Sequence, residues 1–232
     1  MGFIHQGDDV IYGFNFDIPD GMWNYRVYKR RGAFYVGIKA SGRLYRVHGV
    51  TADGRFANLP YMNAPECGAY RRGGNCCRID LLVDGYLRGK FSYDDVFERV
   101  KNCSVVSAPG CSMHSLIGDA RGNMLLVEPG LGYREIREKY ALICNFPVMQ
   151  DKDKLHPELE GWYGFDRYER AKALLDASDG SFTLEDGMKV LDSAMQTAGA
   201  PTRVSFVYSV GTKTVVYKTD RGEAGTLTLS EV

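Results

Sequence analysis

The chain has 232 residues, 44% of them hydrophobic and 25% charged, which is enough to bury a sizeable core and predicts one globular domain over 1–232. Its 29 basic and 29 acidic residues cancel, which argues against electrostatic capture of nucleic acid or of an anionic membrane. The sequence shows neither an apolar run of membrane-spanning length nor a signal peptide, so we expect a cytoplasmic protein.

The six cysteines and four histidines do not have the spacing of a metal site. Cys76 and Cys77 are adjacent instead of forming a C-x-x-C pair, and the histidines are scattered without a ligand pair. We therefore expect no metal and no cofactor. Because no export signal is present, free thiols are expected in place of disulfides.

The first third of the chain predicts an antiparallel sheet. Short segments rich in Val, Ile, Tyr and Phe are separated by turn signals such as Asp53-Gly54. The expected strands are 9–16, 23–29, 33–39, 43–49 and 55–61. Basic residues alternate with aromatic ones in 26–31, as in nucleic-acid-binding strands, but the zero net charge favours one solvated sheet face.

Helical periodicity appears in two later regions. It predicts two helices within 76–102, with Ser92 capping the second. It predicts two more over 165–177 and 184–197. Thr183 is the N-cap of the second of these, and the side chain of Asp186 is shorter than the Glu or Gln that normally bonds back to the N-cap N–H in a capping box. Further strands are expected at 113–120, 123–128, 131–136, 141–144, 203–209, 213–219 and 225–230. Runs of strands followed by pairs of helices predict an α+β layered fold.

Two polar residues, Asn15 and Asp17, stand where a buried strand enters a turn. They belong to Gly13-Phe14-Asn15-Phe16-Asp17, which follows the apolar run 10–12. By itself such a pair is explained either by an Asx turn or by a functional carboxylate.

The order of six segments along the chain favours the functional carboxylate. The segments are 13–17, 49–61, 114–128, 142–147, 166–168 and 202–208. In this order they resemble the motifs of the linear amide C-N hydrolases of the N-terminal-nucleophile (Ntn) superfamily, which include choloylglycine hydrolases, penicillin V acylases and acyltransferase-like thiol enzymes. Residues 13–17, for example, are similar to the family element G-R-N-x-D. The resemblance implies a four-layer α/β/β/α sandwich of two antiparallel sheets between helix layers.

The resemblance also implies a reaction, the hydrolysis of a small acyl amide by an amino-terminal cysteine. The α-amine of that cysteine acts as the base, since α-amines titrate at about pH 8, close to a thiol. Relatives of this kind are commonly dimers or tetramers, so the resemblance allows for a homo-oligomer. Because the chain is shorter than typical bile salt hydrolases, a smaller acyl amide is expected in place of a sterol conjugate.

This sequence departs from the family at the nucleophile. It starts Met1-Gly2-Phe3, its first cysteine is Cys67, and family spacing places the nucleophile a few residues upstream of Met1. Three hypotheses account for this: a native chain that opens with a cysteine and hydrolyses amides, an inactive member that binds a small ligand, or Gly2 in the place of the nucleophile after a shortened first strand. The bond Gly110-Cys111 is a further candidate, because some superfamily members expose their nucleophile by cleaving a Gly-Cys bond.

Four catalytic roles are carried over by position. Asp17 matches the aspartate that orients the terminal amine, and Arg167 matches the arginine near the nucleophile. Asn145 matches an oxyanion donor. Tyr61 falls at the second oxyanion position, which Asn58 or Asn63 would fill after a small register shift.

The substrate pocket is the least specific part of the prediction. Phe14 stands where bile salt hydrolases have an arginine, which removes a charge that would lower the thiol pKa. Together with Phe14, Met62, Phe146 and Trp162 are expected either to line an acyl pocket or to be ordinary core.

Overall fold

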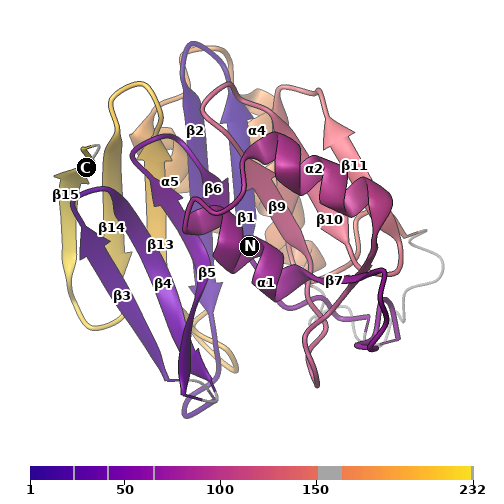
Figure 1. Cartoon of the computed structure of the whole chain (residues 1–232). Helices are drawn as coiled ribbons and strands as arrows, with labels where there is room; N and C mark the ends of the chain where they lie inside the picture. Colours follow the sequence, from indigo (N-terminus) through magenta and orange to yellow (C-terminus); the bar gives the residue numbers. More distant parts are fainter. Residues whose placement is uncertain (23, 41, 65, 151–163, 231–232) are drawn as a thin grey trace.

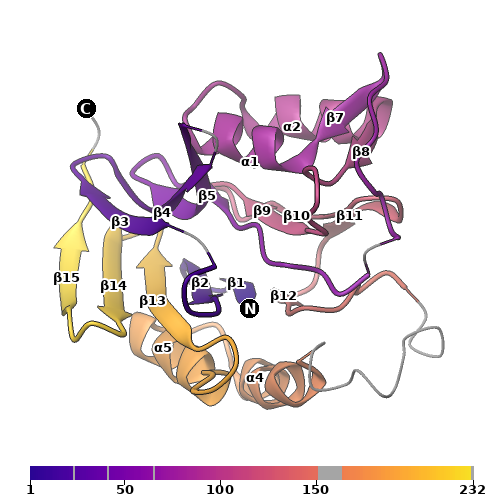
Figure 2. The same cartoon turned by 90° about the horizontal axis from the view of Figure 1, so that it is seen from below.

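The computed structural model describes residues 1–22, 24–40, 42–64, 66–150 and 164–230. The chain folds into four layers in the order α/β/β/α (Figure 1). Figure 2 shows α1 and α2 on the outer face of one sheet and α4 and α5 on the outer face of the other. The two sheets face each other between these helices (Figures 1 and 2). The predicted four-layer α+β sandwich of antiparallel sheets is confirmed.

The first sheet has six strands in the order β12-β1-β2-β13-β14-β15. Their bounds are β1 Gly2–Gln6, β2 Val10–Asp17, β12 Tyr140–Ile143, β13 Thr202–Ser209, β14 Thr214–Thr219 and β15 Ala224–Thr228. Strand β1 has no counterpart among the predicted strands. Its five residues are buried except Gln6, so they lack the polar and apolar alternation that marks a half-buried strand.

The second sheet has seven strands in the order β11-β10-β9-β6-β5-β4-β3. Their bounds are β3 Tyr25–Arg30, β4 Ala33–Ala40, β5 Arg43–Thr51, β6 Phe56–Ala57, β9 Ser115–Gly118, β10 Met124–Glu128 and β11 Gly132–Ile136. The strand expected over 55–61 is only two residues long. It stops because the Leu59 N–H donates to the His48 side chain and Pro60 has no N–H to give. Strands β7 Cys76–Arg78 and β8 Ser104–Val106 form a separate parallel pair that was not predicted.

The helices are α1 Ile79–Leu87, α2 Tyr93–Asn102, α4 Phe165–Ala177 and α5 Leu184–Ser193. The predicted Ser92 cap is confirmed. Asp186 does reach back, since its carboxylate accepts the Thr183 N–H at 3.2 Å, so the short side chain completes a capping box. Helix α5 ends before the predicted 197 because Gln196 and Thr202 exchange two hydrogen bonds that lead the chain into β13.

Two apolar layers surround the first sheet. One lies between the sheets and contains Tyr12, Phe14 and Phe206, and the other lies under α4 and α5 and contains Met1 and Phe3. A Cβ at Gly13 would lie 2.1 Å from the Phe3 ring, so only glycine allows β2 to pack this closely on β1. Strand β1 is therefore covered on both faces, and the first residue of the chain lies in the interior.

Candidate active site

The amine of Met1 is held in place just before the first residue of β1. In the antiparallel pair of β1 and β2, Gly2 lies opposite Phe14. The Met1 amine donates to the Asn15 carbonyl oxygen at 3.2 Å, and the Asn15 N–H donates to the Met1 oxygen at 2.9 Å. The same amine lies 3.9 Å from the Asp17 carboxylate. A buried ammonium group thus has one carbonyl and one carboxylate partner.

Asp17 is fixed by a buried arginine. Arg167, near the start of α4, is 4% exposed, and its guanidinium donates to Asp17 at 3.0 Å and to the side-chain oxygen of Asn145 at 2.9 Å. Thr202 and Gln196 donate two more hydrogen bonds to the Asp17 carboxylate, at 2.6 and 3.1 Å. This network brings together three of the predicted site residues, and it aligns Asp17 with the terminal amine.

Asn145 joins this network to the segment that carries Tyr61. Its amide Nδ2 donates to the Tyr61 carbonyl oxygen at 2.8 Å, and its own carbonyl accepts the Asn63 N–H at 2.7 Å. Tyr61 is half exposed, and this bond is made to its backbone. Of the two other residues proposed for the oxyanion position, Asn63 therefore contributes a backbone bond.

Asn58, the third of these, lies directly over residue 2. Its side-chain oxygen accepts the Leu116 N–H at 2.9 Å, which leaves the amide Nδ2 pointing the other way. That Nδ2 is buried and finds no hydrogen-bond partner among the described residues. A Cβ built on Gly2 would lie 2.2 Å from it. A hydrogen-bond donor is thus aimed at residue 2, the arrangement that an oxyanion requires.

An aromatic pair fills the place where the family has an arginine. Phe14 stacks on the His48 ring, with centroids 4.1 Å apart and planes at 21°. The pKa of His48 is held well below its usual value, chiefly by burial and to a smaller extent by the nearby terminal ammonium. The ring is therefore neutral. The sequence contained no signal for His48, because no ligand or nucleophile spacing involves it.

A pH dependence follows from His48. Its folded pKa lies below the unfolded value of about 6.5, so the unfolded chain binds an extra proton once the pH falls below that value. The stability contributed by the neutral ring is complete above about pH 6.5 and is lost as the pH falls toward the folded pKa. We expect His48→Asn, which keeps an acceptor for the Leu59 N–H, to make the free energy of unfolding less dependent on pH in this range. The slope should decrease by up to about 1.4 kcal/mol per pH unit.

Urea unfolding at several pH values between 7.5 and 4.5 measures that slope. His5, whose pKa is also lowered, chiefly by burial, leaves a residual slope in the variant. Equal slopes in the wild-type and His48→Asn proteins would show that His48 is not the titrating group.

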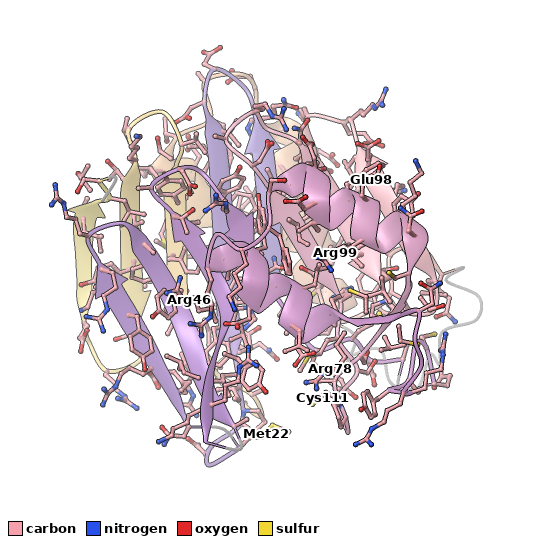
Figure 3. All side chains as sticks on the ribbon, in the orientation of Figure 1. Met22, Arg46, Arg78, Glu98, Arg99 and Cys111 are labelled. Carbon is pink, nitrogen blue, oxygen red and sulfur yellow. The ribbon has the colours of Figure 1, made fainter. Side chains whose placement is uncertain are left out.

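The Cys144 thiol lies beside the terminal amine. In the antiparallel pair of β1 and β12, Gly2 lies opposite Ile143. Cys144, which follows Ile143, and Met1, which precedes Gly2, therefore lie in the same buried cluster. Burial raises the pKa of this thiol, while the terminal ammonium and Arg167 oppose the rise. Cys111, by contrast, lies in a turn near Asp80, on the side of the molecule that carries α1 (Figure 3).

Close packing closes the site on the side of α4. Gly164, the left-handed N-cap residue of that helix, has φ 72°, and a Cβ there would lie 2.5 Å from the Arg167 guanidinium and 2.7 Å from the Cys144 sulfur. Only glycine therefore fits between Arg167 and Cys144.

The predicted pocket residues pack as core. Met62 is fully buried, and Phe146 packs on the rings of Phe165 and Tyr168 at 4.5 and 5.0 Å. Trp162 lies outside the described residues. Within the described ranges, no group of His, Cys, Asp and Glu side chains is arranged to hold a metal ion.

The fold is shared with several solved hydrolases and acylases that are 12–15% identical to this chain. The chain is similar to a variant of conjugated bile acid hydrolase from Clostridium perfringens, with TM-score 0.66 and 12% identity over 98% of this chain and 92% of that one. It is similar to penicillin V acylase from Agrobacterium tumefaciens, with TM-score 0.67 and 15% identity over 98% and 85%.

A third similar structure is the Caenorhabditis elegans orthologue of N-acylethanolamine-hydrolyzing acid amidase, with TM-score 0.60 and 14% identity over 90% and 92%. No protein-family model and no curated protein sequence matches the chain. In the part of the chain that the structure describes, no helix is both long and apolar enough to cross a membrane.

Proposed function

We propose that the protein hydrolyses a linear amide and removes the acyl group from a small N-acyl compound at the buried terminal amine. The observation that carries this proposal is the amine itself, held between the Asn15 carbonyl and Asp17, with Arg167 behind the carboxylate. An amine kept in this way is a base at a fixed position, which general acid–base catalysis needs. The similar structures, an acid amidase, an acylase and a bile acid hydrolase, support the reaction class.

The reaction has two stages. A thiol gives its proton to the amine and attacks the amide carbon, and the charge that develops on the oxygen is met by the buried Asn58 Nδ2. The resulting ammonium protonates the leaving nitrogen as the carbon–nitrogen bond breaks. Water, with the same amine as base, then hydrolyses the thioester and regenerates the thiol.

Three positions are candidates for the source of the thiol. The family resemblance points to a cysteine upstream of Met1, but added residues would turn the Met1 nitrogen into an amide next to Asp17. Residue 2 is a second candidate position for the nucleophile, since Gly2 lies opposite Phe14, which stands where the family has its arginine. A third candidate is Cys144, which is buried in the same apolar cluster as Met1.

The test begins with N-terminal peptide mass spectrometry of the protein from its native source, which defines its first residue. This protein is then incubated with penicillin V, an N-acylethanolamine, an N-acyl amino acid and a conjugated bile acid. We expect release of the amine product from at least one of the smaller amides, and an acyl group on a cysteine in the quenched reaction. Asp17→Asn should slow release, whereas Asp166→Asn, an exposed control on α4, should not. Failure to release any product would sink the proposal.

A second function, ligand binding without turnover, is favoured by one observation. Gly2, which lies opposite Phe14 and under Asn58, has no side chain to act as a nucleophile. A protein of this kind would bind an acyl amide and release it unchanged.

Restoring the thiol tests the second function. The Gly2→Cys variant is prepared with the new cysteine as its first residue. The Asn58 side chain has to shift to admit the new Cβ, and the cysteine should then become acylated, with a mass increase equal to the acyl group. Gly2→Ala, which adds the same Cβ beside Asn58 without sulfur, is the matched control. Wild-type turnover of the same substrate would exclude the binding-only function.

A further inference from the structure

A hollow of about 550 Å³ lies on the outer face of the seven-stranded sheet, beside the end of α1. Tyr35 and Leu87, both buried, are part of its lining, and four arginines, Arg30, Arg46, Arg55 and Arg88, also face it. Figure 3 shows Arg46 on the face of the sheet that carries α1, so the sheet separates this hollow from the candidate active site. Its volume is within the range of small-molecule sites.

The charges of this arginine hollow do not cancel. Arg55 forms an ion pair with Asp53 at 2.7 Å, and Arg88 donates to the buried Asp84 at 2.8 Å. Arg30 and Arg46 have no carboxylate partner in the described ranges of the chain. Two positive charges therefore remain in one concave site of a protein whose formal net charge is zero.

Arg46 is also held in a fixed orientation. Its guanidinium lies 4.5 Å from the centre of the Tyr35 ring, and one of its N–H groups donates to the Leu87 carbonyl at 2.9 Å. Its Nε is buried and meets no acceptor among the residues that the structure describes. Because this Nε is covered by protein atoms, a ligand in the hollow reaches the guanidinium through its terminal nitrogens.

We propose that the arginine hollow binds a small molecule through a phosphate group. A phosphate carries up to two negative charges and three acceptor oxygens, which matches the two unneutralised guanidinium groups of Arg30 and Arg46. Tyr35 and Leu87 provide apolar surface for the organic part of the ligand. The proposal does not depend on amide hydrolysis, because the site lies across the sheet from the terminal amine.

Adenosine 5′-monophosphate and inorganic phosphate are the probes, titrated calorimetrically at low and at physiological ionic strength. We expect both to bind, adenosine monophosphate more tightly, and Arg46→Gln to weaken binding at least about tenfold, since it removes a hydrogen bond to a charged group. Arg30→Gln should weaken binding about as much. Arg26→Gln is the matched control, because Arg26 is exposed on the same strand but does not line the hollow.

Circular dichroism and thermal melting verify that each variant folds. If Arg46→Gln does not fold, Arg30→Gln decides, since the contact recorded for the Arg30 guanidinium is with the Tyr28 ring at 5.7 Å. The proposal is overturned if neither probe binds, if the Arg30 and Arg46 variants bind as well as Arg26→Gln, or if citrate binds as tightly as adenosine monophosphate.

Discussion

Replacing Arg167 by methionine is expected to lower the free energy of unfolding by about 3–5 kcal/mol, because it removes the closer of the two charged partners of the buried Asp17 carboxylate and leaves only the terminal ammonium at 3.9 Å. The methionine is similar in length, so the loss comes from the missing ion pair and from the bond to Asn145, with little contribution from a cavity. Chemical denaturation monitored by fluorescence and by circular dichroism measures the change.

Arg170→Met is the matched control for this prediction. Arg170 lies on the same helix and pairs with Asp166 at 2.9 Å, but both side chains are about half exposed or more. An exposed pair of this kind contributes about 0–1 kcal/mol. In the double variant Asp17→Asn with Arg167→Met, part of the lost stability should return, because the carboxylate that lost its arginine is removed, although the terminal ammonium then keeps only the Asn15 carbonyl as a partner. Equal effects of Arg167→Met and Arg170→Met would contradict the burial argument.

Replacing Glu128 by alanine is expected to cost about 3 kcal/mol or more and to displace the turn after Asn145. The fully buried Glu128 carboxylate accepts the N–H groups of Val148 and Met149 at 2.7 and 2.8 Å, and it lies 3.1 Å from His114 Nδ1. Alanine would leave these buried donors without an acceptor.

The displacement matters for the site, since the turn positions Asn145. His114 Nε2 also lies 2.8 Å from the Cys144 carbonyl, so Glu128 supports the chain on both sides of Cys144 and Asn145. We expect Glu128→Ala to impair amide hydrolysis even where the protein remains folded, and Glu128→Gln to impair it less. Glu135→Ala, on the neighbouring strand, is the control. Unchanged stability in Glu128→Ala would show that water replaces the carboxylate at no cost.

Local patterns account for most of the elements that the sequence predicted. The caps at Ser92 and Thr183 are local signals, and both are confirmed. Strand β1 was missed because burial on both faces removes the alternation by which strands are recognised. The strand expected at 55–61 was cut short by the bond from the Leu59 N–H to His48, which no local pattern contains.

The part of the candidate site that could be predicted lies in segments that resemble family motifs and occur in the family's order. Asp17, Asn145 and Arg167 were selected in this way, and the structure brings them into one hydrogen-bonded network. Asn58 and His48 could not be selected, because their importance depends on what lies across from them. Asn58 was one of three residues compatible with the oxyanion position, and only the approach of the two sheets places its amide beside Gly2.

The sequence by itself determined the helices, most strands and the polar residues of the network, because hydrophobic period, caps and motif order are properties of neighbouring residues. Tertiary structure alone decided which residue of β2 lies opposite Gly2. That choice depends on the register between β1 and β2, which follows from the short turn between Gln6 and Val10 and from burial of β1 on both faces. A register is a relation between two strands, and the composition of either strand alone does not contain it.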